Sequence, residues 1–240
     1  MTESRYTTQT LTMTRTQARQ EASTVFLAKV FNWMAIGLAL TGGVALLTAN
    51  TGLARTIVAT PLFFILVLAE LGLVFFLSAR IEKIQPATAT GLFVGYAVLN
   101  GLTLSVIFLA YTSASIASTF FITAGMFGAM AVYGLVTKRD LSAMGSFLFM
   151  GLIGIILASI VNIFLKSSAL YWTISVIGVL VFVGLTAWDV QKIKNMGEQG
   201  IMSQGEGAIR KGAILGALAL YLDFINLFLM LLRFFGSSRD

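Results

Sequence analysis

Seven long apolar runs constrain what this chain can fold into. Each approaches or exceeds about 18 residues, the length at which a helix rising about 1.5 Å per residue crosses a bilayer core. The runs lie at 25–49, 57–79, 87–110, 117–136, 143–165, 171–189 and 212–232. Only 11% of the 240 residues are charged, against about 25% in soluble domains. The sequence therefore predicts an all-α polytopic membrane protein with no room for a soluble catalytic domain.

The polar residues outside these runs divide the chain. Residues 1–24 are rich in Thr, Gln and Arg and predict a disordered cytoplasmic tail, with a transmembrane domain over 25–236. The tail has no short apolar core with an Ala-x-Ala-like site, so the first apolar run is expected to stay as an anchor. The glycine-rich segment Asn195–Gly207 is the one loop long enough to move or to bind a partner, and a flexible connector is the favoured interpretation.

The basic residues predict an orientation. When alternate connections are counted together, twelve Lys and Arg fall on the side of the amino terminus and four on the other side. Because cytoplasmic loops carry the excess of basic residues, the amino terminus is expected in the cytoplasm. Seven spans then put the carboxyl terminus outside, and a re-entrant last segment is the alternative. The net charge of +6 is explained by orientation, so the expected partner is the lipid bilayer and not nucleic acid.

The last apolar run, Gly212–Leu232, has a carboxylate at its middle. An aspartate at this depth costs about 3 kcal/mol on insertion scales, so Asp223 should face protein or water. Helical spacing places small and polar residues on the same face; these are Gly212, Gly216, Ala219, Asp223 and Asn226. Such a face suits close helix contacts and predicts a helix that the others surround. The alternative is an ordinary membrane helix with a structurally satisfied aspartate.

Carboxylates are the candidate functional groups, because the chain has no histidine and no cysteine. This composition excludes disulfides, thiolate chemistry and a serine–histidine triad. Three acids lie in or at the end of spans: Glu70, Asp189 and Asp223. Arg80 ends the second span on the same side as Asp189, and the two could form a bidentate latch. Alternatively, Asp189 is a surface acid paired with a nearby lysine.

Two motifs resemble those of a known family. One is Gly184-Leu-Thr-Ala-Trp-Asp-Val-Gln-Lys-Ile-Lys194, and the other is Ala219-Leu-Tyr-Leu-Asp-Phe-Ile-Asn-Leu-Phe-Leu-Met-Leu-Leu-Arg-Phe-Phe-Gly236. Together they resemble the Bax inhibitor-1 family, also called the transmembrane Bax inhibitor motif family, and most of all its bacterial inner-membrane members. The resemblance covers about residues 25–236. It implies seven transmembrane helices, with the last one central between two three-helix layers.

The family resemblance also implies a function, a pH-sensitive calcium leak channel in the bacterial inner membrane. Asp189 and Asp223 match the family's paired aspartates, and Glu70 matches an acid thought to line the ion path. Arg80 matches, within one residue, an arginine that latches onto the first aspartate. No cofactor is implied, and calcium enters as the permeant or bound ion.

Carboxylate chemistry can supply this function without histidine. Calcium prefers oxygen ligands, so Asp189 and Asp223 are the candidate metal ligands. Two neighbouring carboxylates cannot both ionise cheaply, and a shared proton would make the pair a pH sensor. Loss of that proton would break the hydrogen bond, loosen the closed packing and expose negative charge to a cation.

Three other functions fit the same sequence less well. A non-conducting stress-response or interaction protein that modulates other membrane machinery needs no ion path and is the main alternative. A proton-coupled transporter is the next. An intramembrane aspartyl protease would carry Gly-x-Gly-Asp and Pro-Ala-Leu motifs, whereas Asp223 lies in Tyr-Leu-Asp-Phe. We therefore expect no enzyme activity, and the sequence names no protein partner.

Overall fold

The computed structural model describes the backbone of residues 2–238 and the side chains of residues 17–238, and helices account for nearly all of it. In chain order these are α1 (Thr2–Asn50), α2 (Leu53–Ala59), α3 (Leu62–Arg80), α4 (Pro86–Leu104), α5 (Ile107–Ala110), α6 (Ser113–Val136), α7 (Ser142–Leu165), α8 (Ser168–Glu198), the 3-10 helix η1 (Ile201–Ser203) and α9 (Glu206–Phe235). An isolated antiparallel β-bridge between Tyr111 and Ser238 joins the segment after α9 to the α5–α6 connection.

Among the residues that the structure describes, seven helical segments are long and apolar enough to cross a membrane, which confirms the all-α polytopic prediction. They are Gln17–Asn50 within α1, Leu62–Arg80, Pro86–Ala110, Ser113–Val136, Ser142–Leu165, Ser168–Glu198 and Glu206–Phe235. The second span begins later than the apolar run suggests. Pro61 is the N-cap of α3, and the residues before it form the separate short helix α2. Proline cannot continue the hydrogen bonding of a preceding helix, so the run is divided there.

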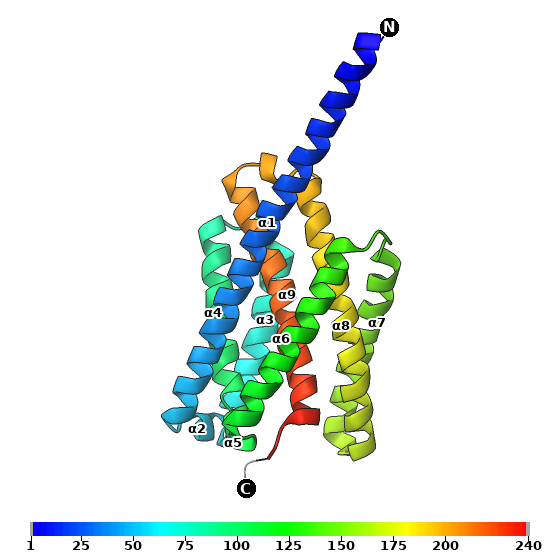
Figure 1. Ribbon diagram of the computed structural model, residues 1–240. Helices are drawn as coiled ribbons and strands as arrows, with labels where there is room; N and C mark the ends of the chain where they lie inside the picture. Colours follow the sequence, from blue (N-terminus) through cyan, green and yellow to red (C-terminus); the bar gives the residue numbers. More distant parts are fainter. Residues whose placement is uncertain (1, 239–240) are drawn as a thin grey trace.

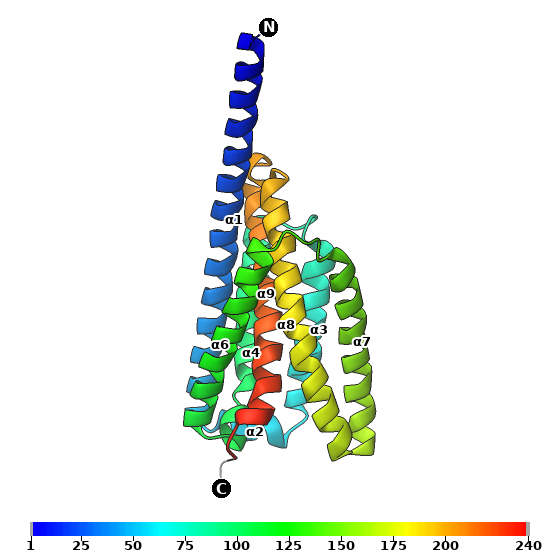
Figure 2. The same ribbon diagram turned by 45° about the vertical axis from the view of Figure 1, so that its right-hand side comes forward.

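The helices form two groups around α9, as Figures 1 and 2 show. α9 packs against α1, α4, α6 and α8; α3 packs mainly on α4, and α7 on α8. In the most apolar part of α9, 72% of the residues are buried, against 6% in α7. The central position expected for the last span is therefore confirmed, with α1, α3 and α4 on one side and α6, α7 and α8 on the other.

Small residues let α9 approach its neighbours closely. A Cβ atom added to Gly212 would lie 2.4 Å from the side chain of Ile201. One added to Gly216 would lie 3.3 Å from both Ile193 and Val30. Larger residues further along α9 then fill the interior, including the fully buried ring of Tyr221. Close approach and van der Waals packing are the main sources of helix association in a bilayer.

The connections that carry most of the basic residues lie together, as the predicted orientation requires. The start of α1 and the α3–α4, α6–α7 and α8–α9 connections share one end of the bundle, and α9 runs unbroken to the other end (Figures 1 and 2). An unbroken helix of 30 residues fits a full span and does not fit a re-entrant segment. Of the four basic residues assigned to the far end, Arg239 lies outside the described residues.

Two predicted irregular segments are more helical than expected. α1 starts at Thr2 and projects beyond the bundle, so the polar residues continue the helix of the first span where the sequence predicts a disordered tail (Figure 1). The division of the chain at residue 24 stays a prediction. The expected loop Asn195–Gly207 is mostly absorbed by the end of α8, η1 and the start of α9. Gly200 and Gly205, both with positive φ, make the turns between them.

Candidate functional site

Two carboxyl groups from neighbouring helices meet inside the bundle. Asp189 projects from α8 and Asp223 from α9, and their carboxyl groups are close enough to share a hydrogen bond. The Asp223 side chain is buried, with 5% of its surface exposed, and Asp189 is half-buried. Asp223 Oδ2 has no hydrogen-bond partner among the described residues. The structure thus brings together the two aspartates that the sequence motifs single out and leaves one acceptor atom unsatisfied.

A lysine one turn along α8 is the cation near this pair. Lys192 interacts electrostatically with Asp189, and its Nζ atom lies 5.0 Å from the centre of the Trp188 ring. Lys194, on another face of α8, instead donates a 2.9 Å hydrogen bond to the carbonyl of Leu135 at the end of α6. Of the nearby lysines that the sequence offered to Asp189, the structure favours Lys192. Asp189 is therefore not a free surface acid, because its carboxyl group meets that of Asp223 and lies in the electrostatic field of Lys192.

Arg80 does not contact the pair. Its side chain is exposed at the end of α3. Within residues 17–238, the one ion pair closer than 4 Å between a Lys or Arg side chain and a carboxylate is Lys194–Glu198. The physical reason is the position of α3, which packs on α4 and not on α8. The expected contact between Arg80 and Asp189 is absent from this structure, and the role of Arg80 as a latch stays a prediction.

Glu70 occupies a separate site on α3. Its carboxylate accepts a 3.2 Å hydrogen bond from Asn100 Nδ2 and another from the Thr103 hydroxyl, both on α4. Only 8% of the Glu70 side chain is exposed. Tyr221 of α9 donates to Asn100 Oδ1 at 3.0 Å and so joins this site to the central helix. The sequence showed Glu70 as a buried acid, but Thr103 and Tyr221 carried no signal, since isolated hydroxyl groups are common in apolar helices.

The acids do not assemble into a larger metal site. Within the described residues, no group of three or more Asp, Glu, His or Cys side chains could hold a metal ion. Calcium takes six to eight oxygen ligands in a resident site. Asp189 and Asp223 offer two carboxylates, fewer than such a site needs.

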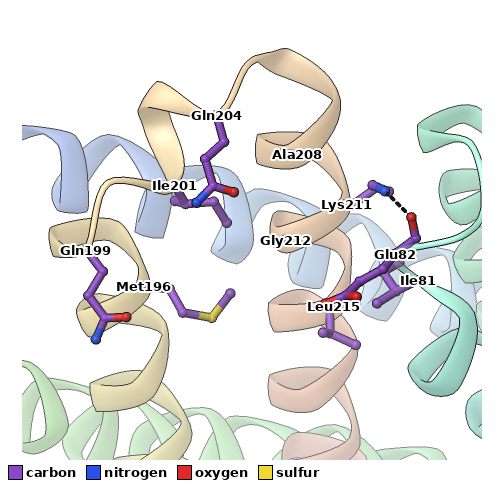
Figure 3. A pocket seen from close by; sticks show the side chains of 10 residues that line it. All are labelled: Ile81, Glu82, Met196, Gln199, Ile201, Gln204, Ala208, Lys211, Gly212 and Leu215. Carbon is purple, nitrogen blue, oxygen red and sulfur yellow. Dashed lines mark hydrogen bonds between the residues drawn. The ribbon is translucent and has the colours of Figure 1, made fainter.

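A hollow of about 480 Å³ lies at the end of the seam between α8 and α9. Figure 3 shows its wall, which includes Met196, Ile201 and Leu215, and the bond of 2.8 Å that Lys211 donates to the carbonyl of Glu82 after α3. The aspartates do not line the hollow. Met196 is seven residues beyond Asp189, about 10 Å along the helix axis. The hollow is thus separated from the carboxyl pair by roughly two helical turns.

Within the described residues, six membrane-spanning helices surround a central seventh, α9, and a carboxyl pair lies between α9 and α8. This arrangement defines an all-α polytopic membrane protein. The model of the family described as Inhibitor of apoptosis-promoting Bax1 matches residues 23–240. The chain belongs to this family, which confirms the resemblance carried by its two motifs.

Bacterial relatives agree over nearly the full length. The chain is similar to Inner membrane protein YbhL of Escherichia coli strain K12, with 57% identity over 216 residues, 89% of this chain and 92% of that protein. It is 49% identical over 233 residues to an uncharacterized protein of Deinococcus radiodurans, covering 97% and 98% of the two chains. An uncharacterized protein of Borreliella burgdorferi is 47% identical over 230 residues, 94% of this chain and 98% of that one.

Proposed function

We propose that this protein is a pH-sensitive calcium leak channel of the bacterial inner membrane, gated by a proton shared between Asp189 and Asp223. The observation that carries the proposal is the contact between these two carboxyl groups across the α8–α9 seam. The unpartnered Oδ2 atom of buried Asp223 supports it, because a buried acceptor without a donor is costly in a purely structural role. The inner-membrane location rests on the name of the relative YbhL and on the seven spans.

The shared proton determines the direction of the pH response. At low pH one proton lies between the two acids, and the hydrogen bond holds α8 against α9. At higher pH the proton leaves, and two like charges then face each other in a medium of low dielectric constant. Their repulsion loosens the seam, while their charge attracts a divalent cation. Lys192 offsets part of the charge on Asp189 only. Leak is therefore lowest in acid and rises with pH.

Calcium flux into liposomes that contain only this protein tests the proposal. Flux should increase as the pH is stepped upward through about 6 to 8, a range in which few groups other than perturbed carboxylates titrate in a chain without histidine. Empty liposomes and liposomes with an unrelated membrane protein are the controls. No calcium flux at any pH would contradict the proposal and favour the alternative, a non-conducting protein that modulates other membrane machinery.

The proposed orientation places the amino terminus in the cytoplasm. It rests on the twelve-to-four distribution of basic residues between the two ends. A reporter that is active only in the periplasm should be silent at residue 1 and active when fused after residue 240. A cytoplasmic reporter should give the reverse pattern. Activity of the periplasmic reporter at residue 1 would show that the whole bundle is inverted.

A further inference from the structure

A row of buried polar groups crosses the bundle at the level of Glu70. It starts at the Glu70 carboxylate, passes through the Asn100 amide and reaches the hydroxyl of Tyr221. From there a 2.7 Å hydrogen bond joins Tyr221 to Thr41 Oγ1, which also lies 2.8 Å from the carbonyl oxygen of Ala97. The row links four helices, because Glu70 is on α3, Asn100 on α4, Tyr221 on α9 and Thr41 on α1. All four side chains are buried.

The hydroxyl groups of this row have fewer protons than possible acceptors. Thr41 has one proton and two acceptors within reach, the Tyr221 oxygen and the Ala97 carbonyl. Tyr221 also has one proton, and it can donate to Asn100 Oδ1 or to Thr41. The Asn100 side chain can present its oxygen or its NH₂ group to either neighbour after a half-turn. The direction of donation along the row is therefore set by one of its ends.

An ionised Glu70 sets one direction. The carboxylate can only accept, so Asn100 turns its NH₂ group toward Glu70 and its oxygen toward Tyr221. Tyr221 then donates to Asn100, and Thr41 donates to Tyr221. This is the arrangement of donors and acceptors in the structure between Glu70 and Tyr221. The protons between Glu70 and Tyr221 point toward the negative charge, as expected for a buried carboxylate stabilised by a polarised chain. At the far end, the Thr41 hydroxyl is within reach of both the Ala97 carbonyl and the Tyr221 oxygen, and in this direction it donates to Tyr221.

A protonated Glu70 sets the opposite direction. The carboxyl group donates to the Asn100 oxygen, the amide turns, and its NH₂ group donates to Tyr221. Tyr221 then donates to Thr41, whose proton passes to the Ala97 carbonyl. We propose that Glu70, Asn100, Tyr221 and Thr41 form a relay whose hydrogen bonds reverse when Glu70 gains or loses a proton. Asn100, Tyr221 and Thr41 are positioning residues in it, and Glu70 is a second proton-dependent element apart from the aspartate pair.

Outside the row, the Glu70 carboxylate accepts one further hydrogen bond, from the Thr103 hydroxyl of α4, which is uncharged and does not titrate. The titratable groups facing it are Tyr96 of α4 and Tyr221 of α9. α4 carries no charged side chain, and Arg55 of α2 is exposed. Within residues 17–238, no lysine or arginine lies within 4 Å of the Glu70 carboxylate. Asp223 lies two residues beyond Tyr221 and is directed to α8, so the relay and the aspartate pair meet the central helix on different faces.

Infrared difference spectra between acidic and alkaline protein test the relay without any flux measurement. Acidification should produce a protonated-carboxyl band together with a change in a tyrosine C–O band, which reports the hydrogen bonding of the phenol. Glu70→Gln should remove the Glu70 part of the carboxyl band, leaving the part that comes from the aspartate pair, and should reduce the tyrosine signal to background. Tyr221→Phe should remove the tyrosine signal alone, and its ring can keep the packing against Phe93 and Tyr96, whose ring centres lie 6.1 and 5.7 Å away.

Matched variants separate the relay from its neighbours. Tyr96→Phe alters the other tyrosine near Glu70, which has no hydrogen bond in the row, and should keep both signals. Asp223→Asn changes the carboxyl band of the aspartate pair but should keep the Glu70 part of the band and the tyrosine signal, whether or not the pair gates calcium. Thr41→Val should shift the tyrosine band while Glu70 still titrates, and it provides the test if Glu70→Gln does not fold.

Three results would each overturn the relay. One is a tyrosine signal that survives in Glu70→Gln, and another is a tyrosine signal that survives in Tyr221→Phe. The third is the absence of any Glu70 carboxyl band between about pH 4 and 8, a range that begins near the unperturbed pKa of carboxyl groups and ends well below that of tyrosine, so that the other tyrosines do not ionise. The infrared result tests the relay, and the flux measurement tests the aspartate pair. Failure of either proposal leaves the other standing.

Discussion

Asp223→Asn should remove most of the pH dependence of calcium flux. The amide keeps the shape of the carboxyl group and can still bond to Asp189, but it cannot gain or lose the shared proton. A site-to-site coupling is typically worth 1–3 kcal/mol, so we expect the change across the pH range to fall from about fivefold or more to less than about twofold. The measurement is initial flux into liposomes at stepped pH, normalised to the reconstituted protein. The absolute rate can move in either direction.

The partner variant makes the test specific for a pair. Asp189→Asn should flatten the pH profile in the same way, and the double variant should resemble either single one, because two coupled acids titrate as one unit. If the two acids acted separately, the effects of the single variants would add. If both single variants keep the wild-type profile, the paired sensor is wrong and Asp223 is a structural acid in a helix bundle.

An exposed acid provides the control. Asp140 lies in the connection between α6 and α7, where hydrogen bonds from the Ser142 hydroxyl and backbone N–H lower the pKa of its carboxyl group below the ordinary value. A carboxylate with a lowered pKa stays ionised through neutral pH and loses its charge only in acid. Asp140→Asn removes one negative charge from the chain without removing a group that titrates between about pH 6 and 8. Its flux profile should match that of the wild-type protein.

The sequence predicted the bundle because lipid imposes simple rules. Apolar length marks the spans, and the small and polar face of Gly212, Gly216 and Asp223 marks a helix that others must surround. The central position of α9 and the meeting of Asp189 with Asp223 follow from these rules and from the two family motifs. An acid in the middle of a membrane span must have a partner inside the protein. The candidate site residues could therefore be recognised from the presence of acidic side chains in apolar runs.

What the sequence missed depends on contacts between helices that are distant in the chain. The expected contact of Arg80 with Asp189 is absent because α3 packs on α4, and no local pattern shows which neighbour a lipid-facing helix will pack against. The role of Arg80 as a latch stays a prediction. The bond between Tyr221 and Asn100 joins residues 121 positions apart. Local propensity carries no information about such a pair. The apolar run 57–79 is continuous in hydrophobicity, so only Pro61 marks the point where α2 ends and α3 begins.

Gly134→Ala should destabilise the fold more than any other glycine-to-alanine change within α6. A Cβ atom at this position would lie 2.3 Å from the carbonyl oxygen of Ala187 and 3.1 Å from two further backbone atoms of that residue. Backbone cannot rotate away as a flexible side chain can, so α6 and α8 must separate. Overpacking of this kind costs about 1–3 kcal/mol. We expect the melting temperature of the purified protein to fall by about 3 °C or more.

Gly128→Ala is the matched control, since it makes the same substitution in the same helix. A Cβ atom at Gly128 meets nothing within 4 Å, so this variant should keep the wild-type melting temperature or exceed it slightly, because alanine favours a helix more than glycine does. The difference between the two variants isolates the contact of α6 with α8. Equal melting temperatures would show that the two helices can separate at little cost. Because Ala187 is two residues from Asp189, a strained α6–α8 contact should also displace the acid, and Gly134→Ala should alter the pH profile of flux where Gly128→Ala does not.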